Sequence, residues 1–401
     1  MNDKPIPSRE LLQLIQARLF KNETGQICTD SPLEYYSSWI PYLEVFDTVV
    51  IFARIDPKVR PGVEVEGPGV HVIEIPYYLG PFGYILRYLR IRRAVRRLVS
   101  SWSGYVAVRM PNPLGKLMQE SASRRQLPFL TQAVGDPEDV LRSGALGRIG
   151  KLATTRAKKE MQSVVNASGA VTYVTLETLQ RKYPAQPSSL VLARSDVKLS
   201  AESFGPKHRD YSVKPVSSPP SIMAVGSQQR RYKGHDVLLH AIHLLVQEGF
   251  DTRLVLIGEG QFHAELVQQA STLGVSDNVT FLPQVGGPED LRRYFGVTDL
   301  FVMPSRTEGL PRVLVEAMAS GIACLGTRVG GIPELLDARA LVAPDDAEGL
   351  ADRIKQVLLA PQVMTSLAEK QFSVANRIWK ENSGDEMLRT FLTEWVLENE
   401  S

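Results

Sequence analysis

The sequence has few of the residues that would give a covalent or metal-based framework. Its two cysteines, Cys28 and Cys324, are far apart and lack CxxC or Cys/His spacing. That spacing supports neither a disulfide framework nor structural zinc, so both are expected to be free thiols. No stretch approaches the roughly 18 apolar residues of a membrane-spanning helix. The N-terminus also lacks the apolar core of a signal peptide. We therefore predict a cytoplasmic protein.

The remaining composition is that of an ordinary globular chain. Of 401 residues, 43% are hydrophobic, 22% charged and 7% aromatic, which excludes disordered and collagen-like classes. At roughly 100–200 residues per domain, the length favours two domains, each able to bury a core. A two-domain enzyme is the first expectation.

The net charge of +2 hides an asymmetry. Residues 1–210 hold 29 Lys and Arg against 20 Asp and Glu, whereas the remainder holds 17 against 24. Residues 75–119 contain no carboxylate, but they carry Arg87, Arg90, Arg92, Arg93, Arg96, Arg97, Arg109 and Lys116. The positive charges of this segment therefore have no carboxylate within the segment to pair with, and we expect them to contact another part of the chain or a partner. Nucleic acid is a poor candidate because no recognition motif accompanies the charge.

The second half of the chain alternates between short apolar runs and amphipathic segments. The apolar runs predict strands over 221–226, 252–258, 278–283, 300–305, 322–327 and 340–344. Helical spacing predicts helices over 234–249, 262–274, 288–296, 310–321, 331–338 and 346–360. Such alternation implies a parallel sheet covered on both faces, that is, a Rossmann-like doubly wound domain.

The first half shows a looser version of the same pattern. Strands are predicted over 11–16, 48–55, 71–78, 105–110, 128–134 and 170–175, although 11–16 could equally be a helix. Helices are predicted over 84–102, 113–126 and 147–167. A Pro- and Ser-rich charged segment suits an interdomain linker. We predict an N-terminal domain over 1–206, a linker over 207–220, a C-terminal domain over 221–382 and a final helical segment over 383–401.

Ligands of open parallel sheets bind beyond the carboxyl ends of the strands. The loop GSQQRRYKG places Lys233 at the start of a helix, where its charge opposes the helix dipole unless an anion such as phosphate lies between them. Arg230 and Arg231 add positive charge to this loop. The alternative is a solvated loop lysine.

The segment SRTEGLPRVLVEAMASG places two glutamates on either side of a helix start. If the helix begins near Pro311, Glu316 lies on its second turn and Glu308 lies just before it. The first N–H groups of the helix are then available to a diphosphate, and each carboxylate can accept hydrogen bonds from a pair of sugar hydroxyls. Taken singly, Glu308 is better explained as an ordinary loop acid and Glu316 as an ordinary mid-helix acid; the whole stretch favours the binding site.

Two glycine-containing turns lie at the same edge of the predicted sheet. Gly330 and Gly331 permit close backbone approach and are followed by Glu334, while Gly258 and Gly260 flank Glu259. A simple chain reversal would also explain either turn.

Together these segments resemble glycosyltransferase family 4, whose members are retaining GT-B enzymes. The resemblance rests on GSQQRRYKGHDVLLHAI, LVLIGEGQ, NVTFLPQV, the E-x(7)-E stretch EGLPRVLVE, AMASGIACLGTRVGGIPELL and LVAPDD, in that order over residues 221–360. It implies an α/β GT-B fold, in which two Rossmann-like doubly wound domains face each other across a cleft. It also implies a nucleotide-sugar donor and a bacterial polysaccharide-building role.

The resemblance assigns roles to individual residues. Glu316 would bind the ribose, Glu308 the donor sugar and Lys233 the pyrophosphate; Glu308 and Lys233 are the predicted catalytic residues. Backbone amides around 310–313 would complete the phosphate cradle. The full predicted donor set is Gly226, Ser227, Arg231, Lys233, Gly258, Glu308, Gly309, Leu310, Pro311, Arg312, Val313 and Glu316.

Two positions depart from the family pattern. Ser227 stands where many members have an arginine, which removes a phosphate contact or moves it to Arg230 or Arg231. No histidine follows the strand PFLTQAV, where many members have one facing the donor sugar, and Asp136 is the nearest candidate for that space.

The N-terminal half resembles bacterial polysaccharide-building members of the family more weakly. In GT-B enzymes this half holds the acceptor, and the last helix returns to it. Tyr88, Ile91, Val95, Leu98 and Trp102 recur at helical spacing and leave Arg90, Arg93 and Arg97 off that stripe. These arginines could contact anionic lipid on the inner face of the plasma membrane, the diphosphate of a lipid-linked acceptor, or only solvent.

The predicted reaction is hexosyl transfer from a UDP- or GDP-sugar to a hydroxyl of a saccharide or lipid-linked saccharide. The sequence shows no metal-binding DxD triplet at a strand end, and no cofactor or metal is expected. A sugar-nucleotide epimerase of the same fold and an inactive nucleotide-sugar-binding subunit are the alternatives.

Overall fold

The computed structural model describes residues 7–138, 147–213, 216–285 and 288–400, which form two compact units. The first unit comprises Met1–Val134, Arg156–Arg194 and Gly384–Ser401, and the second comprises Gly135–Thr155 and Ser195–Ser383. Both differ from the predicted domains, because the second unit already begins at Ser195 and also takes in residues 135–155.

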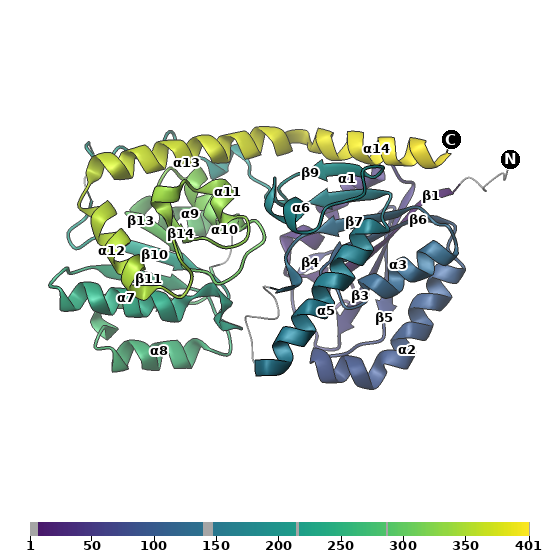
Figure 1. Ribbon diagram of the computed structural model, residues 1–401, viewed down its shortest axis with the longest axis horizontal. Helices are drawn as coiled ribbons and strands as arrows, with labels where there is room; N and C mark the ends of the chain where they lie inside the picture. The colour runs from purple at the N-terminus through teal and green to yellow at the C-terminus, as the bar shows by residue number, and fades with distance from the viewer. Residues whose placement is uncertain (1–6, 139–146, 214–215, 286–287, 401) are drawn as a thin grey trace. The chain divides into compact units, whose positions relative to one another are not determined.

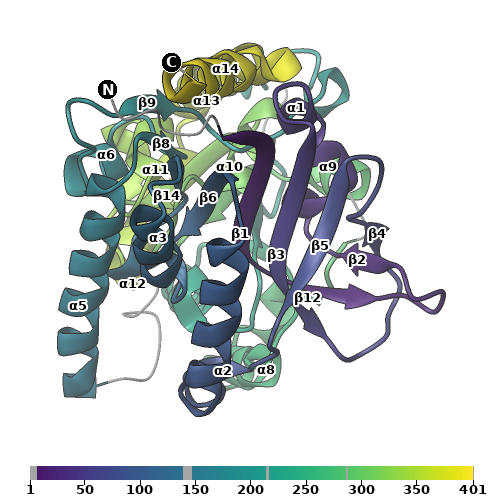
Figure 2. The ribbon, with the colours of Figure 1, turned by 90° about the vertical axis from the view of Figure 1, so that its right-hand side faces the viewer.

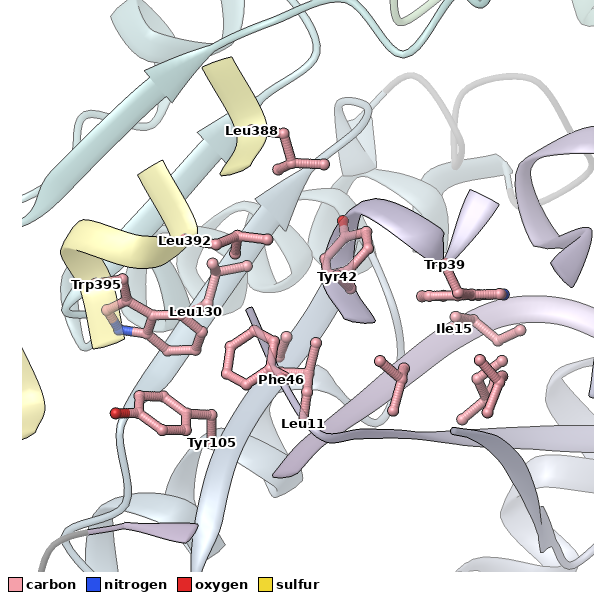
Figure 3. Packing of buried hydrophobic residues seen from close by; sticks show 14 of the residues in the cluster. Leu11, Ile15, Trp39, Tyr42, Phe46, Tyr105, Leu130, Leu388, Leu392 and Trp395 are labelled. Atoms are coloured by element: carbon pink, nitrogen blue, oxygen red, sulfur yellow. The ribbon is translucent and has the colours of Figure 1, made fainter. Parts of the chain in front are cut away.

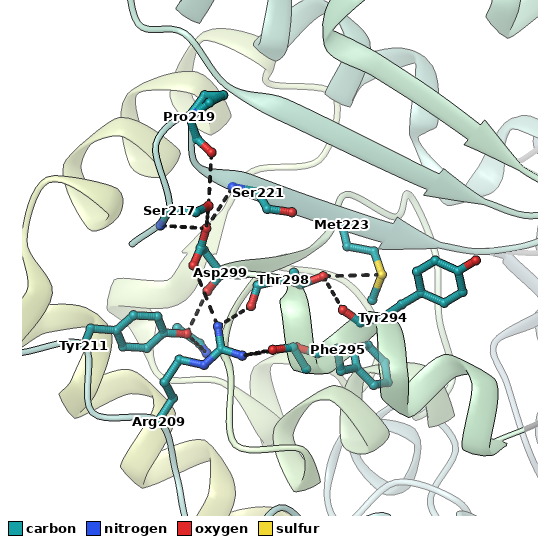
Figure 4. A network of polar contacts seen from close by, with 12 residues as sticks. Arg209, Tyr211, Ser217, Pro219, Ser221, Met223, Tyr294, Phe295, Thr298 and Asp299 are labelled. Atoms are coloured by element: carbon teal, nitrogen blue, oxygen red, sulfur yellow. Dashed lines mark hydrogen bonds and ion pairs between the residues drawn. The ribbon is translucent and has the colours of Figure 1, made fainter. Parts of the chain in front are cut away.

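The predicted linker over 207–220 packs on the second unit instead of connecting two domains freely. The Arg209 guanidinium donates to the carbonyl oxygen of Thr298. The Tyr211 hydroxyl donates to the carbonyl oxygen of Asp299 over 2.7 Å, and the Asp299 carboxylate accepts the backbone N–H of Ser217 over 3.2 Å. Figure 4 shows this network, which holds the segment against the start of the second sheet.

The second unit is built on a six-stranded parallel sheet. Its strands are β10 (Ser221–Val225), β11 (Arg253–Ile257), β12 (Val279–Leu282), β13 (Leu300–Met303), β14 (Ala323–Thr327) and β15 (Leu341–Val342). Their order is β12-β11-β10-β13-β14-β15. From β10 the chain adds β11 and then β12 on one side. It then returns to the other side of β10, where it adds β13, β14 and β15. This reversal makes the region beyond β10 and β13 the topological switch point, where open sheets bind ligands.

Helices connect the strands of the second unit as the alternating pattern predicts (Figure 1). They are α7 (His235–Gln247), α8 (His263–Thr272), α9 (Pro288–Val297), α10 (Arg312–Ala319), α11 (Ile332–Leu335), α12 (Ala347–Leu358) and α13 (Pro361–Asn382). Each presents an apolar face to the sheet or to a neighbouring helix. In α7, for example, Leu238, Ile242 and Leu245 are buried at helical spacing.

The first unit contains a larger, mainly parallel sheet. Its strands are β1 (Ser8–Lys21), β2 (Ile27–Thr29), β3 (Thr48–Asp56), β4 (Val63–Glu64), β5 (Val70–Ile75), β6 (Gly104–Met110), β7 (Phe129–Ala133), β8 (Ala170–Tyr173) and β9 (Leu190–Ala193). The central strand β1 pairs in parallel with β3 and β6 and antiparallel with β2. Residues 11–16, which the pattern left open, are therefore strand; residues 11–15 are buried on both faces of the sheet, including the polar Gln13.

The helices of the first unit are α1 (Ile40–Leu43), α2 (Gly80–Ser100), α3 (Gly115–Arg124), α6 (Thr178–Lys182) and α14 (Glu386–Glu400), together with the part of α5 (Gly147–Asn166) from Arg156 onward. Figure 2 shows α2 beside α3 on one face of the sheet, and the two helices contact each other. Among the described residues, no helix is both long enough and apolar enough to cross a membrane.

The last helix completes the core of the first unit, as Figure 3 shows. Leu388, Leu392 and Trp395 of α14 are buried in one cluster with Phe46 and Tyr105. The Trp395 ring lies 5.0 Å from that of Tyr105 in an edge-on arrangement, and the Tyr105 hydroxyl donates to the carbonyl oxygen of Val396. The chain terminus thus stabilises a sheet formed by residues several hundred positions earlier.

Candidate functional site

The loops after β10 and β13 bring Lys233 and Glu308 together at the switch point of the second sheet. Lys233 Nζ donates to Glu308 Oε1 over 2.7 Å, and Ser305 Oγ donates to the same oxygen over 2.7 Å. The side chains of Lys233 and Glu308 are only 14% and 9% exposed. Among the described residues, none donates a hydrogen bond to Glu308 Oε2, so this oxygen is available to a ligand hydroxyl.

The surroundings of Lys233 keep its ammonium group charged. Burial lowers the pKa of Lys233, but Glu308 and Tyr232 more than offset this effect, so the pKa is raised. The side chain lies along Gly226, where a Cβ atom would be 2.9 Å from Lys233 Cγ. Gly226 therefore provides the space for a buried lysine, one of whose three N–H donors is held by Glu308.

His235, the first residue of α7, is buried and follows this lysine by two residues. Burial and the nearby Lys233 charge lower its pKa to about 4. The imidazole is therefore neutral at neutral pH, and the local positive charge comes from the lysine. Sequence reasoning quoted His235 within its motif without assigning it a role.

Arg306 holds the lysine loop in place. Its guanidinium forms two hydrogen bonds of 2.8 Å to the Asp236 carboxylate and a third to Asp345, while its backbone N–H donates to the carbonyl oxygen of Tyr232 over 2.7 Å. Burial raises the pKa of Asp236. The hydrogen bonds and the positive charge of Arg306 lower that pKa by more, so the net shift is downward. Sequence reasoning quoted Arg306 within the segment SRTEGLPRVLVEAMASG but gave it no role.

The start of α10 presents backbone N–H groups beside Glu308. Pro311 precedes the helix, which begins at Arg312, one residue later than predicted, and no side chain caps this end. The first N–H groups of any helix lack intrahelical acceptors. Gly309, Leu310 and Val313 lie around this helix start.

Glu316 lies on the second turn of α10 and is partly buried. Burial raises the pKa of its carboxyl, and the positive charge of Arg312 one turn earlier partly offsets that effect. A partly buried carboxylate with few nearby donors has lost hydrogen bonds to water. Hydroxyl groups of a ligand can replace those hydrogen bonds, so they stabilise such a carboxylate strongly.

Glycines allow the loops at this edge to approach each other. Gly330 has φ +51°, and a Cβ atom there would be 1.7 Å from the carbonyl oxygen of Glu308. The next N–H, that of Gly331, donates to the carbonyl oxygen of Gly309 over 2.7 Å. Gly258 makes a similar approach to Gly226, where a Cβ atom would be 2.0 Å from the carbonyl oxygen. The turn at Gly330 therefore positions the Glu308 loop, and the turn at Gly258 positions the loop after β10, so both do more than reverse the chain.

Other predicted donor residues lie farther from the pair. Arg231 forms an ion pair with Glu265 and stacks on the Phe262 ring 5.3 Å away, so its side chain extends toward α8. The Ser227 hydroxyl accepts the backbone N–H of Gln229 over 3.3 Å. Ser227 therefore shapes its own loop and does not replace the charge of an arginine.

The predicted acceptor residues do not form one group. Arg90, Arg93 and Arg97 are exposed on α2 of the first unit. Asp136 is 3% exposed and accepts the backbone N–H of Glu138 over 2.9 Å. Asp136 falls in the second unit, although it was predicted to belong to the N-terminal domain.

One arginine of the carboxylate-free segment 75–119 pairs with a carboxylate from outside that segment. The Arg109 guanidinium pairs with Glu34 in the interior of the first unit and donates to Gln132 Oε1 over 3.4 Å. Arg109 is therefore part of the framework, unlike the arginines of α2. Over the described part of the chain, no group of three or more His, Cys, Asp or Glu side chains is placed to hold a metal ion.

Sequence comparison identifies the part of the chain that carries this site. Residues 219–359 match the family described as glycosyl transferases group 1. The matched residues lie within the second unit. Protein CapJ of Staphylococcus aureus is 29% identical over 81% of each chain. A D-inositol 3-phosphate glycosyltransferase of Saccharomonospora viridis is 31% identical over 58% of this chain and 57% of its own length.

Solved structures extend the likeness in fold to the whole chain. Sucrose-phosphate synthase from Thermosynechococcus elongatus superposes with a TM-score of 0.70 at 15% identity, over 98% of this chain and 100% of its own. Anabaena Alr3699/HepE, solved in complex with UDP-glucose, gives a TM-score of 0.61 at 14% identity, over 97% of this chain and 98% of its own. The predicted α/β GT-B fold with two Rossmann-like halves is thereby confirmed. The residues that match glycosyl transferases group 1 include Lys233, Glu308 and Glu316.

Proposed function

We propose that the protein is a retaining glycosyltransferase that moves a hexosyl group from a nucleotide-diphosphate sugar to a hydroxyl of a saccharide or lipid-linked saccharide. The observation that carries the proposal is the 2.7 Å contact between Lys233 and Glu308 beside the uncapped start of α10. It combines a cation and helix N–H groups for a diphosphate with a carboxylate oxygen for a sugar hydroxyl. The UDP and UDP-glucose complexes of HepE agree with such a donor.

In the proposed reaction, the acceptor oxygen forms a bond to the anomeric carbon as the bond from that carbon to the diphosphate oxygen breaks. The acceptor proton passes to a phosphate oxygen of the departing nucleotide. Negative charge develops on the diphosphate, and Lys233 and the N–H groups of α10 stabilise it most in the transition state. Glu308 Oε2 positions the sugar, and Glu316 accepts the ribose hydroxyls. The proposed reaction assigns no residue to binding a cofactor or a metal ion.

A donor panel tests the proposal. UDP- and GDP-sugars are added to the full chain, and the ligand that binds the folded state should raise the melting temperature by mass action. In Glu316→Gln the stabilisation by that donor should fall, because a neutral amide replaces an acceptor of two ribose hydroxyls. The exposed Glu348 of α12 offers the matched control Glu348→Gln, which should retain the wild-type response.

The products distinguish the proposal from its alternatives. Incubation of the stabilising donor with saccharide or polyprenyl-linked acceptors should release the free nucleoside diphosphate and an elongated acceptor, as followed by mass spectrometry. An isomerised nucleotide sugar would instead identify an epimerase. Donor binding without hydrolysis or transfer to any acceptor would identify a binding subunit.

A further inference from the structure

Helix α2 carries two apolar stripes, and only one of them is buried. Ile91, Val95 and Val99 are fully buried and anchor the helix to the first unit. The second stripe, on the N-terminal half of α2, is exposed; we call it the outer stripe. It comprises Phe82, Ile85, Leu86 and Leu89, which are 73%, 67%, 71% and 60% exposed. An amphipathic helix on a globular protein normally turns its one apolar face inward, so the outer stripe requires an explanation.

The helix presents this stripe from a fixed position. The Tyr84 ring lies 5.3 Å from that of Tyr78 and 5.7 Å from that of Tyr88, and the Tyr84 hydroxyl donates to the carbonyl oxygen of Pro113 over 3.2 Å. These contacts lie on the inner side of α2. The exposed leucines therefore belong to a packed helix and not to a frayed end. Of the stripe predicted from Tyr88 to Trp102, Ile91 and Val95 are buried, whereas Tyr88 is 38% exposed and Trp102 lies beyond the end of the helix.

Arginines continue the face of the outer stripe toward the C-terminal end of α2. Arg93 follows Leu89 by four residues and Arg97 follows Arg93 by four, which places all three on one line of the helix surface. Arg90, Arg93 and Arg97 are exposed, and in the described part of the chain none of them forms an ion pair. The absence of carboxylates over residues 75–119 leaves this positive charge uncompensated along the helix.

We propose that this face of α2 docks on an anionic lipid surface. The outer stripe would lie in the boundary between headgroups and acyl chains, and the three arginines would contact lipid phosphates. A second copy of the chain is a worse occupant, because a symmetric contact would bring two sets of unpaired arginines together. A nucleic acid would leave the apolar stripe without a partner. The inference goes beyond the proposed function and does not depend on it, since docking involves neither donor nor acceptor.

Vesicle flotation with the full chain tests the docking. Wild-type protein should float with phosphatidylcholine vesicles that contain phosphatidylglycerol and stay behind with pure phosphatidylcholine. Binding should weaken as salt is added, because exposed charges are screened. Since each basic residue near an anionic surface contributes about 1 kcal/mol, the triple variant Arg90→Gln/Arg93→Gln/Arg97→Gln should bind on the order of a hundredfold more weakly.

The apolar part of the face is tested separately. Ile85→Gln/Leu86→Gln should weaken vesicle binding at least about tenfold, because two side chains no longer leave water. Matched controls are Leu397→Gln, at an exposed leucine of α14, and Arg124→Gln/Arg125→Gln, at two exposed arginines where α3 ends. Both controls should bind like wild type. All substituted positions are exposed, so circular dichroism should show an unchanged fold.

The depth of insertion gives an independent readout. Tryptophan fluorescence of Phe82→Trp, after subtraction of the wild-type signal, should be quenched by brominated acyl chains in anionic vesicles. The proposal is overturned if wild type does not bind anionic vesicles, if the outer-stripe variant binds as well as wild type, or if Trp at position 82 is not quenched. It is also overturned if wild type forms dimers that Ile85→Gln/Leu86→Gln abolishes while vesicle binding is unchanged. Failure of donor binding would leave each of these measurements intact and would count only against the proposed function.

Discussion

Lys233 and Glu308, separated by 75 positions in the sequence, form an ion pair of 2.7 Å at the point where the strand order of the second sheet reverses. The two side chains arrive on separate loops, one after β10 and one after β13. Their contact places a cation next to a carboxylate with one free oxygen. A ligand with both a phosphate and a hydroxylated sugar matches this pair.

The first prediction concerns the charge of Lys233. Lys233→Ala should lower kcat for glycosyl transfer by about a hundredfold to a thousandfold, because one preorganised donor to the leaving group is lost. Lys355→Ala is the matched control, since Lys355 also pairs with a glutamate, Glu248 over 2.6 Å, but lies on the surface. Steady-state kinetics with the donor found in the panel make the comparison. Equal kcat values for Lys233→Ala and wild type would remove Lys233 from the site.

The second prediction concerns Arg306 as a positioning residue. A double-mutant cycle with Arg306→Gln and Asp236→Asn should give a coupling free energy of about 1–3 kcal/mol in unfolding, because the pair is bidentate and partly buried. Arg306→Gln should also raise the donor KM more than it lowers kcat, since the loop of Lys233 loses its anchor.

The exposed pair of Arg339 and Asp337 provides the reference cycle. Its coupling should be below about 1 kcal/mol, as for surface ion pairs in general. If the two cycles give the same coupling and the donor KM of Arg306→Gln equals that of wild type, Arg306 has no positioning role.

The third prediction separates close packing from backbone strain at two glycines. Gly330→Ala would place a Cβ atom 1.7 Å from the carbonyl oxygen of Glu308, whereas a Cβ atom at Gly274, with φ +70°, would have no other atom within 4 Å. Gly274→Ala should cost about 1–2 kcal/mol of stability, from the left-handed backbone alone. Gly330→Ala should cost more and should also abolish stabilisation by the donor. Chemical denaturation and the thermal-shift assay measure both; equal effects of the two substitutions would contradict the packing argument.

The fourth prediction concerns the pH dependence of stability through His235. Its folded-state pKa of about 4 lies below the unfolded value of 6.5, so the unfolded state binds more protons between these values. This group therefore destabilises the protein progressively as the pH falls from about 6.5 to about 4, by about 3 kcal/mol over the window.

His235→Asn should remove that component, so its unfolding free energy should fall less steeply with decreasing pH than that of wild type. Urea denaturation across the window measures the slope. The exposed His240 supplies the control His240→Asn, whose slope should match wild type. A wild-type slope in His235→Asn would show that the buried imidazole contributes nothing to the acid dependence.

The sequence by itself determined the local structure of the second unit and the residue types of its site. Strand and helix periods are local properties, so β10 to α12 could be predicted from spacing alone. The KG and E-x(7)-E elements pointed to Lys233, Glu308 and Glu316 because each follows a predicted strand or opens a predicted helix.

Only the tertiary structure decided which loops meet and which apolar face is covered. The Lys233 to Glu308 contact and the anchoring by Arg306 depend on strand order, which couples residues far apart and leaves no periodic signal. Arg209 and Tyr211 pack in the second unit through hydrogen bonds to the carbonyl oxygens of Thr298 and Asp299, which composition does not predict. In α2 both apolar stripes have helical spacing, so spacing alone does not show which stripe is buried. Only one face of a helix can pack on a sheet at a time. In the structure that face carries Ile91 and Val95, and Phe82 and Leu89 on the opposite face are exposed.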